Sequence, residues 1–533
     1  MTSNIQPIYY RRCSTHKVNI GAGGTAMGGN YPVLVQTMTD TPTLDIEAST
    51  AQVLRLVRAG ARLVRLTAQT AHHADALGDI RQRLDAVGCH VPLCADIHFN
   101  PNAAFEAAKH VEKVRINPGN FADPGRTFVK LEYTDEEYAA EQERIAERLR
   151  PLLALCRERK VALRLGVNHG SLSDRIMSRY GDTPEGMAES AMEYLRICRA
   201  ANFEDVVVSI KASNVVVMTH TVRLLVAAME AEGMDFPLHL GVTEAGDGED
   251  ARVKSAAGIG SLLTDGIGDT IRVSLSEPPE CEIPVAYTLL AHTDAVARRN
   301  AAMPMNKLSY DFGACGLEPI SGDIYVHGVD DPKTAPSTVL SACDAIEWRR
   351  RLAEYLDKGN REPVMARLTY SMSLRGTALV LAVAADLGAL LLNPLPLLAG
   401  IQVTAPGASD AELSRLLLSV MQACRRRITR TEYIACPGCG RTLFDLRDTL
   451  DNVRRATSHL TGLKIAVMGC VVNGPGEMAD ADYGYVGAAA GHVSLYRRRE
   501  CVRRNIPQAD AVQALIQLIK DCGDWKDPNE ENA

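Results

Sequence analysis

The segment Leu63-Val64-Arg65-Leu66-Thr67 is one of eight short runs, rich in aliphatic and β-branched residues, that recur in the amino-terminal part of the chain. Each run ends in polar residues, and an amphipathic segment of helical length follows it. Parallel strands need crossover helices of this kind, and eight such units in about 300 residues are typical of a (β/α)8 barrel. The predicted strands are 33–37, 63–67, 92–97, 113–117, 162–167, 205–211, 237–243 and 269–274.

A doubly wound open sheet is the alternative arrangement for alternating strands and helices. Its commonest nucleotide-binding version carries a Gly-x-Gly-x-x-Gly turn after the first strand. No such turn follows residues 33–37. The pattern therefore favours an α/β fold that begins with a TIM-type barrel.

Length, charge and composition limit the remaining architecture and the class of partner. A chain of 533 residues is too long for one hydrophobic core, so two or three domains are expected. The net charge of -7 argues against nucleic acid as a main partner. The longest apolar stretch, 377–392, is shorter than a bilayer span, so no membrane segment is expected. The thinly spread cysteines and the lack of an apolar leader predict a cytoplasmic protein.

Charged and amide side chains follow the predicted strands at their carboxyl ends, where barrel enzymes carry their active sites. Five are cations from five strands, and converging cations repel one another unless an anion binds between them. Arginine forks suit phosphate oxygens, so a diphosphate-bearing substrate is favoured over a purely structural charge network. The strand-end residues expected to bind it are Arg65, Arg115, Asn117, Arg164, Asn168, Lys211, Arg272 and Ser274.

Three further strand-end groups are candidates for proton transfer, namely Glu244, Asp96 and His98. Either Glu244 or the Asp96–His98 pair could instead orient the arginines. The glycine-rich segment 258–268 is expected to form loops that let the backbone approach a ligand closely.

Two loops near the carboxyl terminus concentrate metal-ligating residues. The first contains Cys436-Pro437-Gly438-Cys439, and a second, thirty residues on, contains Cys470 and Glu477. A tight turn brings two thiolates to one side, and a third from another loop adds a further corner of a tetrahedron. Glu477 is the nearest candidate for a replaceable fourth ligand. Spacing alone leaves three alternatives open: an iron–sulfur cluster, a structural zinc ion, and no metal at all.

Three domains are predicted. Residues 1–302 form the barrel, 303–427 an inserted spacer or interface domain, and 428–533 an α/β domain that carries the cysteine loops. The insertion is too short for a second barrel, which needs at least about 200 residues. Its helix-like runs are 337–356 and 411–427, and its strand-like runs are 364–370 and 379–384. In the last domain a helix is expected over 445–460, a strand over 464–468 and a closing helix over 507–522.

The motifs together resemble the 4-hydroxy-3-methylbut-2-enyl diphosphate synthase family, iron–sulfur enzymes of the methylerythritol phosphate route to isoprenoids. The inserted segment resembles that of the three-domain members found in plants, chlamydiae and some other bacteria, although it is shorter. The stretches that carry the resemblance are 35–39, 95–99, 114–120, 165–172, 265–272, the Cys436 turn and 469–477.

The resemblance implies a reaction and a cofactor. The reaction is reductive ring opening and dehydration of 2-C-methyl-D-erythritol 2,4-cyclodiphosphate. A [4Fe-4S] cluster held by Cys436, Cys439, Cys470 and Glu477 would deliver the two electrons. Asn473 would contact the substrate beside the strand-end set, and Glu244 is the favoured proton donor, with Asp96 or His98 as alternates.

The resemblance also implies a homodimer, in which the cluster domain caps either its own barrel or its partner's. Ferredoxin or flavodoxin is the expected electron donor, because the chain shows no flavin or nicotinamide fingerprint. A basic run, Arg497 to Arg499 with Arg503 and Arg504, is a possible docking face for such an acidic partner. Two other functions remain as alternatives: a pterin-type barrel transferase with a structural zinc tail, and a non-enzymatic iron–sulfur carrier.

Overall fold

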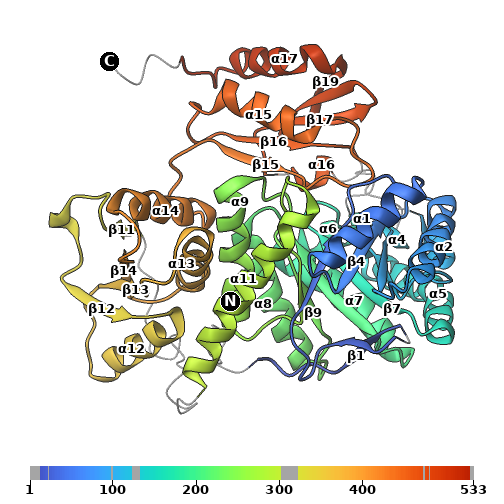
Figure 1. The fold of residues 1–533 in the computed structure, drawn as a ribbon, viewed down its shortest axis with the longest axis horizontal. Helices are drawn as coiled ribbons and strands as arrows, with labels where there is room; N and C mark the ends of the chain where they lie inside the picture. Colours follow the sequence, from blue (N-terminus) through green and yellow to red (C-terminus); the bar gives the residue numbers. More distant parts are fainter. Residues whose placement is uncertain are drawn as a thin grey trace. The chain divides into compact units, whose positions relative to one another are not determined.

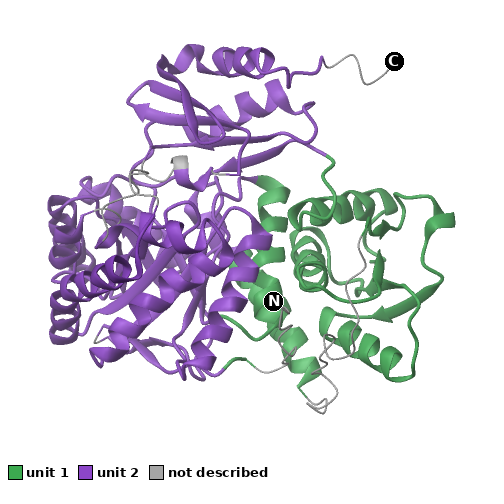
Figure 2. Cartoon of the chain, turned by 180° about the vertical axis from the view of Figure 1, so that it is seen from behind, with its two compact units in different colours: residues 1–13, 248–268, 285–429 green, residues 14–247, 269–284, 430–533 purple. Residues whose placement is uncertain are grey.

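A computed structural model describes residues 12–21, 23–97, 100–122, 132–301, 322–471, 474–478 and 480–527. Two predicted site residues, His98 and Asn473, lie outside the described residues. The chain divides into two compact units (Figure 2). Unit 1 comprises residues 1–13, 248–268 and 285–429, and unit 2 comprises 14–247, 269–284 and 430–533.

Unit 2 contains a closed barrel of eight parallel strands, in the order β10-β3-β4-β5-β6-β7-β8-β9 (Figure 1). The predicted barrel is confirmed, and each predicted strand overlaps an observed one. All of these strands are buried along their length, because side chains fill the barrel inside and helices cover it outside. The strands are β3 (Leu34–Met38), β4 (Leu63–Thr67), β5 (Leu93–Asp96), β6 (Lys113–Ile116), β7 (Ala162–Asn168), β8 (Val206–Lys211), β9 (Leu238–Leu240) and β10 (Thr270–Ile271).

Polar caps start the helices that connect these strands. Thr134 and Glu137, for example, form a reciprocal capping box at the start of α5. At the amino-terminal end of the barrel, the hairpin of β1 (Val18–Ile20) and β2 (Thr25–Met27) packs Val18, Ile20 and Met27 onto the first residues of the strands. The helices are α1 (Ile46–Arg58), α2 (Ala71–Ala86), α3 (Pro101–Ala107), α4 (Pro118–Phe121), α5 (Asp135–Arg159), α6 (Asp174–Tyr180), α7 (Pro184–Ala200) and α8 (Val215–Ala231).

The C-terminal domain of unit 2 is a five-stranded sheet in the order β15-β16-β17-β18-β19. The first three strands are parallel, and β18 and β19 add an antiparallel hairpin. The predicted α15, β16 and α17 are confirmed, whereas β17 to β19 were not predicted. The elements are β15 (Glu432–Ala435), α15 (Leu446–Thr457), β16 (Lys464–Met468), α16 (Gly474–Glu477), β17 (Tyr483–Ala489), β18 (His492–Arg497), β19 (Glu500–Pro507) and α17 (Gln508–Asp521).

Unit 1 contains a parallel four-stranded sheet in the order β11-β14-β13-β12. The predictions for 364–370 and 411–427 are confirmed. The prediction of a helix over 337–356 is wrong at its start, which is strand β12. The predicted strand 379–384 is wrong, because it lies inside a helix that is apolar and buried on nearly all sides and so lacks amphipathic periodicity. The elements are β11 (Tyr325–Val326), β12 (Thr338–Ala342), α12 (Ala345–Asp357), β13 (Val364–Thr369), α13 (Gly376–Leu391), β14 (Leu398–Thr404) and α14 (Asp410–Ala423).

The first part of the glycine-rich segment is helical, so the prediction that 258–268 forms ligand-binding loops is wrong there. After α9 (Gly248–Ser255) the chain continues through a π-helical turn, Ala256–Gly260, into α10 (Ser261–Thr264). A Cβ atom added to Gly260 would lie 2.5 Å from Ala385 Cβ on α13. The glycine therefore allows close helix packing inside unit 1. Helix α11 (Glu282–Asn300) follows the last barrel strand, β10.

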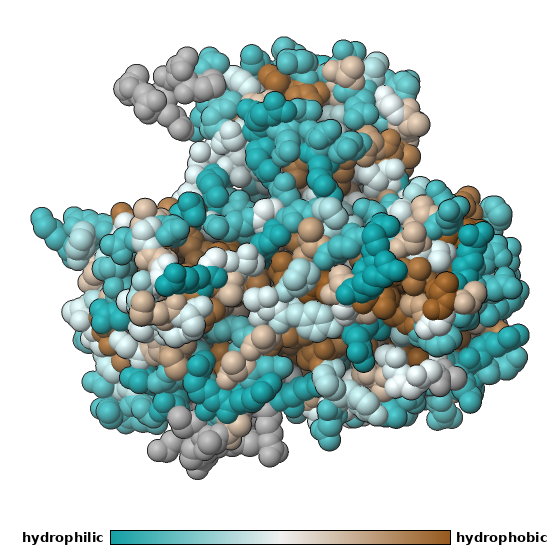
Figure 3. Space-filling model, viewed as in Figure 1, coloured by the Kyte–Doolittle hydropathy of each residue, from teal (hydrophilic) through white to brown (hydrophobic). Residues whose placement is uncertain are grey.

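The surface of the molecule carries both hydrophilic and hydrophobic residues. Figure 3 shows hydrophilic residues over much of the visible face, with hydrophobic residues between them, as in most folded proteins. Within the described ranges, no helix combines the length and the apolar character that crossing a bilayer requires.

Candidate active site

The carboxyl ends of the barrel strands and both cysteine loops of the C-terminal domain face one cavity in unit 2. The space between its atoms, counted together with solvent at its open side, is about 630 Å³. Ten of the predicted site residues line it, together with Arg441, which was not predicted. The ten are Arg65, Arg115, Asn168, Lys211, Glu244, Arg272, Cys436, Cys439, Cys470 and Glu477.

Glycines allow the C-terminal domain to lie directly on the barrel of its own chain. A Cβ atom on Gly170 would lie 2.1 Å from the carbonyl oxygen of Gly476, and one on Gly440 would lie 2.7 Å from that of Thr41. Backbone pairing between Ala245 and Ala435 extends the same contact. Because the two glycine contacts adjoin the two cysteine loops, backbone contacts with the barrel hold both loops over the strand ends.

Asp96 gathers arginines and does not line the cavity. It is fully buried at the end of β5, and its Oδ1 lies 3.2 Å from Arg115 Nη1 and 3.8 Å from Arg65 Nε. Its Oδ2 lies 3.4 Å from Arg441 Nη2. Burial lowers the pKa of Arg65, and Asp96 opposes that shift. These contacts favour the alternative in which Asp96 orients the arginines over a role in proton transfer.

Two other cations at the cavity, Arg272 and Lys211, differ in whether a carboxylate pairs with them. Arg272 forms two hydrogen bonds to Glu282, at 2.9 and 3.1 Å, and Glu282 also accepts one from Thr37. No carboxylate of the described residues forms an ion pair with Lys211. Burial, followed by the neighbouring arginines, holds the pKa of Lys211 well below its ordinary value. An anion in the cavity would relieve this repulsion.

Three predicted substrate-binding residues do not line the cavity. Arg164 lies four residues before the end of β7, roughly 13 Å deeper along the strand, and its Nε donates to Ser209 Oγ at 2.9 Å. Burial holds its pKa well below the ordinary value. Asn117 caps α4 by accepting from the Gly119 amide, and Ser274 is buried after β10.

Two carboxyl groups meet at the cavity. Burial raises the pKa of Glu244 well above its ordinary value, and nearby Glu477 raises it further. Glu244 is 3% exposed, and its φ of 51° is left-handed, a rare conformation for this residue type that is often found at functional sites. Asn168 Nδ2 donates to Glu477 Oε1 at 2.6 Å. A buried carboxyl group whose pKa is raised, such as that of Glu244, is the kind of group that acts as a proton donor.

The three thiols come from neighbouring strand ends. Cys436 follows β15 and Cys470 lies two residues beyond β16, and these strands pair in parallel. The amide of Gly469 donates to Cys436 Sγ at 3.3 Å, while burial raises the pKa of this thiol.

The spacing of the donor atoms bears on which kind of metal centre the four residues would fit. A single tetrahedral zinc ion holds its sulfurs about 3.8 Å apart, from Zn–S bonds of about 2.3 Å. Among the described residues, no three donor atoms of Cys436, Cys439, Cys470 and Glu477 lie within 4.8 Å of one another. Three thiols and a carboxylate that share one cavity at wider spacing fit a polynuclear group better than one ion.

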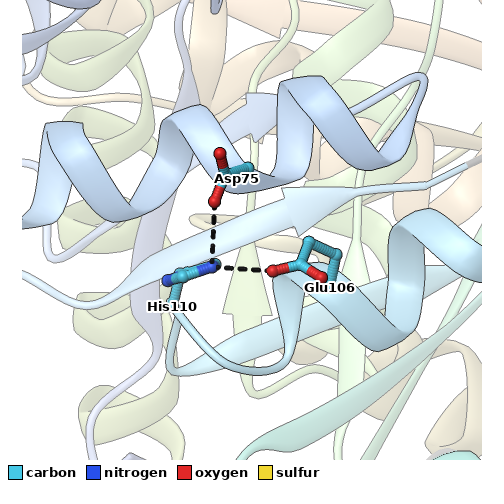
Figure 4. A group of neighbouring side chains, drawn as sticks. All are labelled: Asp75, Glu106 and His110. Atoms are coloured by element: carbon cyan, nitrogen blue, oxygen red, sulfur yellow. Dashed lines mark hydrogen bonds and ion pairs between the residues drawn. The ribbon is translucent and has the colours of Figure 1, made fainter.

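A different group of ionisable side chains lies on the outer helices of the barrel. Figure 4 shows His110 directed toward Glu106 on α3 and Asp75 on α2. Its Nε2 lies 3.1 Å from Glu106 Oε1 and 3.8 Å from Asp75 Oδ1. Because Lys109 also pairs with Glu106, at 2.6 Å, we interpret the group as a cluster of surface ion pairs.

The fold and the site define a barrel enzyme whose polycationic cavity adjoins a thiol-bearing C-terminal domain. The chain belongs to the GcpE family: residues 15–287 match the GcpE TIM-barrel domain and residues 432–521 match the GcpE protein C-terminal domain. The family resemblance drawn from the motifs is thereby confirmed.

Relatives match over nearly their whole length. A protein of Parabacteroides distasonis named 4-hydroxy-3-methylbut-2-en-1-yl diphosphate synthase (flavodoxin) is 47% identical over 94% of this chain and 97% of its own. One of the same name from Akkermansia muciniphila is 44% identical over 98% of both chains. Among solved structures, Burkholderia cenocepacia dihydropteroate synthase covers 54% of this chain and 100% of its own, at 15% identity and a TM-score of 0.36. That likeness is too distant to bear on function.

Proposed function

We propose that this protein catalyses the reductive ring opening and dehydration of 2-C-methyl-D-erythritol 2,4-cyclodiphosphate to 4-hydroxy-3-methylbut-2-enyl diphosphate. One observation carries the proposal: a single cavity joins the strand-end cations to three thiols and a carboxylate. The full-length relatives support it, because their names state this synthase activity. They give no support to a pterin-type transferase with a structural zinc tail.

The cofactor that we infer is a [4Fe-4S] cluster held by Cys436, Cys439, Cys470 and Glu477. When bound, such a cluster supplies single electrons and one iron with an exchangeable ligand position. Two electrons and two protons enter, the ring C–O bond breaks with its oxygen kept on the diphosphate, and the hydroxyl group of the adjacent carbon leaves as water, which forms the C=C bond of the product. The relatives' names give flavodoxin as their electron donor, and we extend that donor to this protein in preference to ferredoxin.

The protein's own residues bind the diphosphate and move the proton. Arg65, Arg115, Lys211 and Arg272 hold the diphosphate group, since four buried cations face one cavity and an anion bound there would relieve their mutual repulsion. Glu244 donates the proton required for loss of water, because burial keeps its carboxyl group protonated.

The other site residues and properties predicted from the sequence are proposed separately. The residues that line the cavity are stabilised by three residues that do not line it themselves, namely Arg164, Asn117 and Ser274. The substrate contact of Asn473 and the role of His98 remain predictions. The homodimer, the cytoplasmic location and the division at 302 and 427 into three domains also remain predictions.

The deciding experiment is anaerobic purification followed by iron and sulfide analysis and an assay with the cyclic diphosphate and a chemical reductant. Four irons and four sulfides per chain are expected, with turnover by the wild type. Glu477→Ala should keep part of the cluster and lose most turnover. A zinc-filled site, or activity unchanged in that variant, would refute the proposal.

A further inference from the structure

Arg441 connects the first cysteine loop to the end of a barrel strand. Its guanidinium lines the cavity, is 8% exposed, and places Nη2 3.4 Å from Asp96 Oδ2. Its Nε has no hydrogen-bond partner among the described residues. The residue thus lies between the proposed cluster ligands and the barrel.

Positive charge gathers at this point. Asp96 is shared by Arg65 and Arg115 from the barrel and by Arg441 from the C-terminal domain. Arg441 thus adds a third buried guanidinium group beside the cavity, and a diphosphate group bound there would attract all three.

The backbone fixes where Arg441 can reach. Gly440 packs so closely on the barrel that an added Cβ atom would lie 2.7 Å from Thr41 O and 2.9 Å from Thr67 Oγ1. The guanidinium therefore reaches Asp96 only while the cysteine loop lies against the ends of β3 and β4. Any anion that binds Arg441 together with the barrel arginines also stabilises this contact.

We propose that Arg441 is a substrate-positioning residue that adds a cation from the C-terminal domain to the barrel mouth. Its pairing with Asp96 links diphosphate binding to seating of the cysteine loop, so that each stabilises the other. The inference rests on the proposed function, because it takes the cyclic diphosphate as the ligand.

The test compares Arg441→Gln and Arg441→Lys with the wild type, as full-length holoenzyme. Calorimetry without reductant measures binding of the cyclic diphosphate, and steady-state assays separate KM from kcat. The Gln variant should bind roughly 10- to 100-fold more weakly, with KM raised more than kcat is lowered, because it loses a charge-assisted interaction in a buried site. The Lys variant should recover part of the loss, since it keeps the charge without the fork. Hydrogen exchange of residues 436–442 should slow on ligand addition in the wild type, and not in the Gln variant.

Arg454→Gln is the matched control. Arg454 pairs with Asp247 and so also joins the C-terminal domain to the barrel, but it does not line the cavity. Equal weakening in this variant would overturn the proposal, because general docking would then explain the effect. Combining Arg441→Gln with Asp96→Asn should give less than the sum of the two losses.

The proposed function and the proposed role of Arg441 can be refuted independently of each other. If the wild type neither binds nor converts the cyclic diphosphate, the proposed function is wrong. If the wild type does both and Arg441→Gln binds equally well, the role of Arg441 alone is wrong. Should the Gln variant not fold, unchanged affinity in Arg441→Lys would overturn the proposal, since a bidentate contact does not survive that replacement.

Discussion

Asn168 at the end of β7 donates a hydrogen bond to Glu477 Oε1 in the C-terminal domain, at 2.6 Å. Its own Oδ1 accepts from Arg115 Nη2, also at 2.6 Å. Because the arginine can only donate, the oxygen of the amide must face it and the nitrogen must face Glu477. The barrel therefore offers Glu477, which would be one of the cluster ligands, an oriented hydrogen-bond donor.

Asn168→Asp should disable this partner without removing the cysteines. The new carboxylate has no donor for Glu477 and repels it, which costs about 1.5–3 kcal/mol for a charge-assisted bond. Turnover with a chemical reductant should fall roughly 10- to 100-fold, while the iron and sulfide content stays at the wild-type level.

Asn214→Asp provides a matched control for this substitution. Asn214 also faces a carboxylate of the C-terminal domain, with Nδ2 3.4 Å from Asp480 Oδ2, but it does not line the cavity. Its capping of α8 through Oδ1 survives the change. An equal loss of turnover in both variants would contradict the special role of Asn168.

Gly170→Ala should separate the C-terminal domain from the barrel mouth. The new methyl group would lie 2.1 Å from Gly476 O, and the φ of 79° adds about 1–2 kcal/mol of strain. We expect folded protein of slightly lower thermal stability that has lost most turnover. Gly233→Ala carries similar strain, at a φ of 67°, with no atom within 4 Å of the added group. Loss of turnover in that control as well would show that strain, and not the contact, is responsible.

The barrel was predictable because strands buried on both faces appear as nearly continuous aliphatic runs. The same property concealed α13, whose apolar residues surround the whole helix and give no helical period. Strand β19 was missed for the opposite reason, since it is mostly exposed and rich in arginine. Short aliphatic runs between polar segments therefore identified the barrel strands, whereas a long helix that is apolar on all sides and a strand that is mostly polar lack the pattern expected of their type.

The types of residue that line the cavity could be predicted from the sequence. How deep along its strand each of them lies could not. Sequence places Arg164 and Asn168 in one run, but only the end of β7 shows that Asn168 faces the cavity and Arg164 lies deeper. Arg441 was missed because its partner Asp96 is 345 residues away in the chain, and Glu282 because it stands at the start of a helix and not at a strand end. A cation directly after the cysteine pair, at Cys439-Gly440-Arg441, was the available signal for the first of them.

The burial of Lys113 leads us to predict an unusual dependence of the protein's stability on pH. It is fully buried in the barrel, its Nζ has no hydrogen-bond partner among the described residues, and burial lowers its pKa to about 7. The unfolded chain binds a proton up to its ordinary pKa of about 10.5, so folding releases that proton between these two values. The cost to stability is therefore complete below pH 7 and disappears as the pH rises toward 10.5.

Lys113→Met should stabilise the protein by a few kcal/mol near pH 7, and by much less near pH 10. Urea unfolding of the variant and the wild type at both pH values measures the difference. Lys109→Met, at an exposed position, is the control and should show no such trend. A stability difference that stays constant with pH would mean that Lys113 titrates normally in the folded state.

Docking of the electron donor gives a final prediction, which concerns the hairpin of β18 and β19. Two of its five arginines already have acidic partners: Arg499 contacts Asp182 at 2.5 Å and Arg503 contacts Asp521 at 3.1 Å. The exposed Arg497, Arg498 and Arg504 form no ion pair with any carboxylate of the described residues. These three are therefore the ones available to an acidic flavodoxin.

Reversing two of these charges, in Arg497→Glu/Arg498→Glu, should raise the KM for flavodoxin roughly tenfold and weaken its dependence on salt. Turnover with a small chemical reductant should not change, because neither residue lines the cavity. Arg455→Glu, at an exposed position on α15, is the control for a general effect of added negative charge. A flavodoxin KM that ignores both salt and the double reversal would place the docking surface elsewhere on the protein.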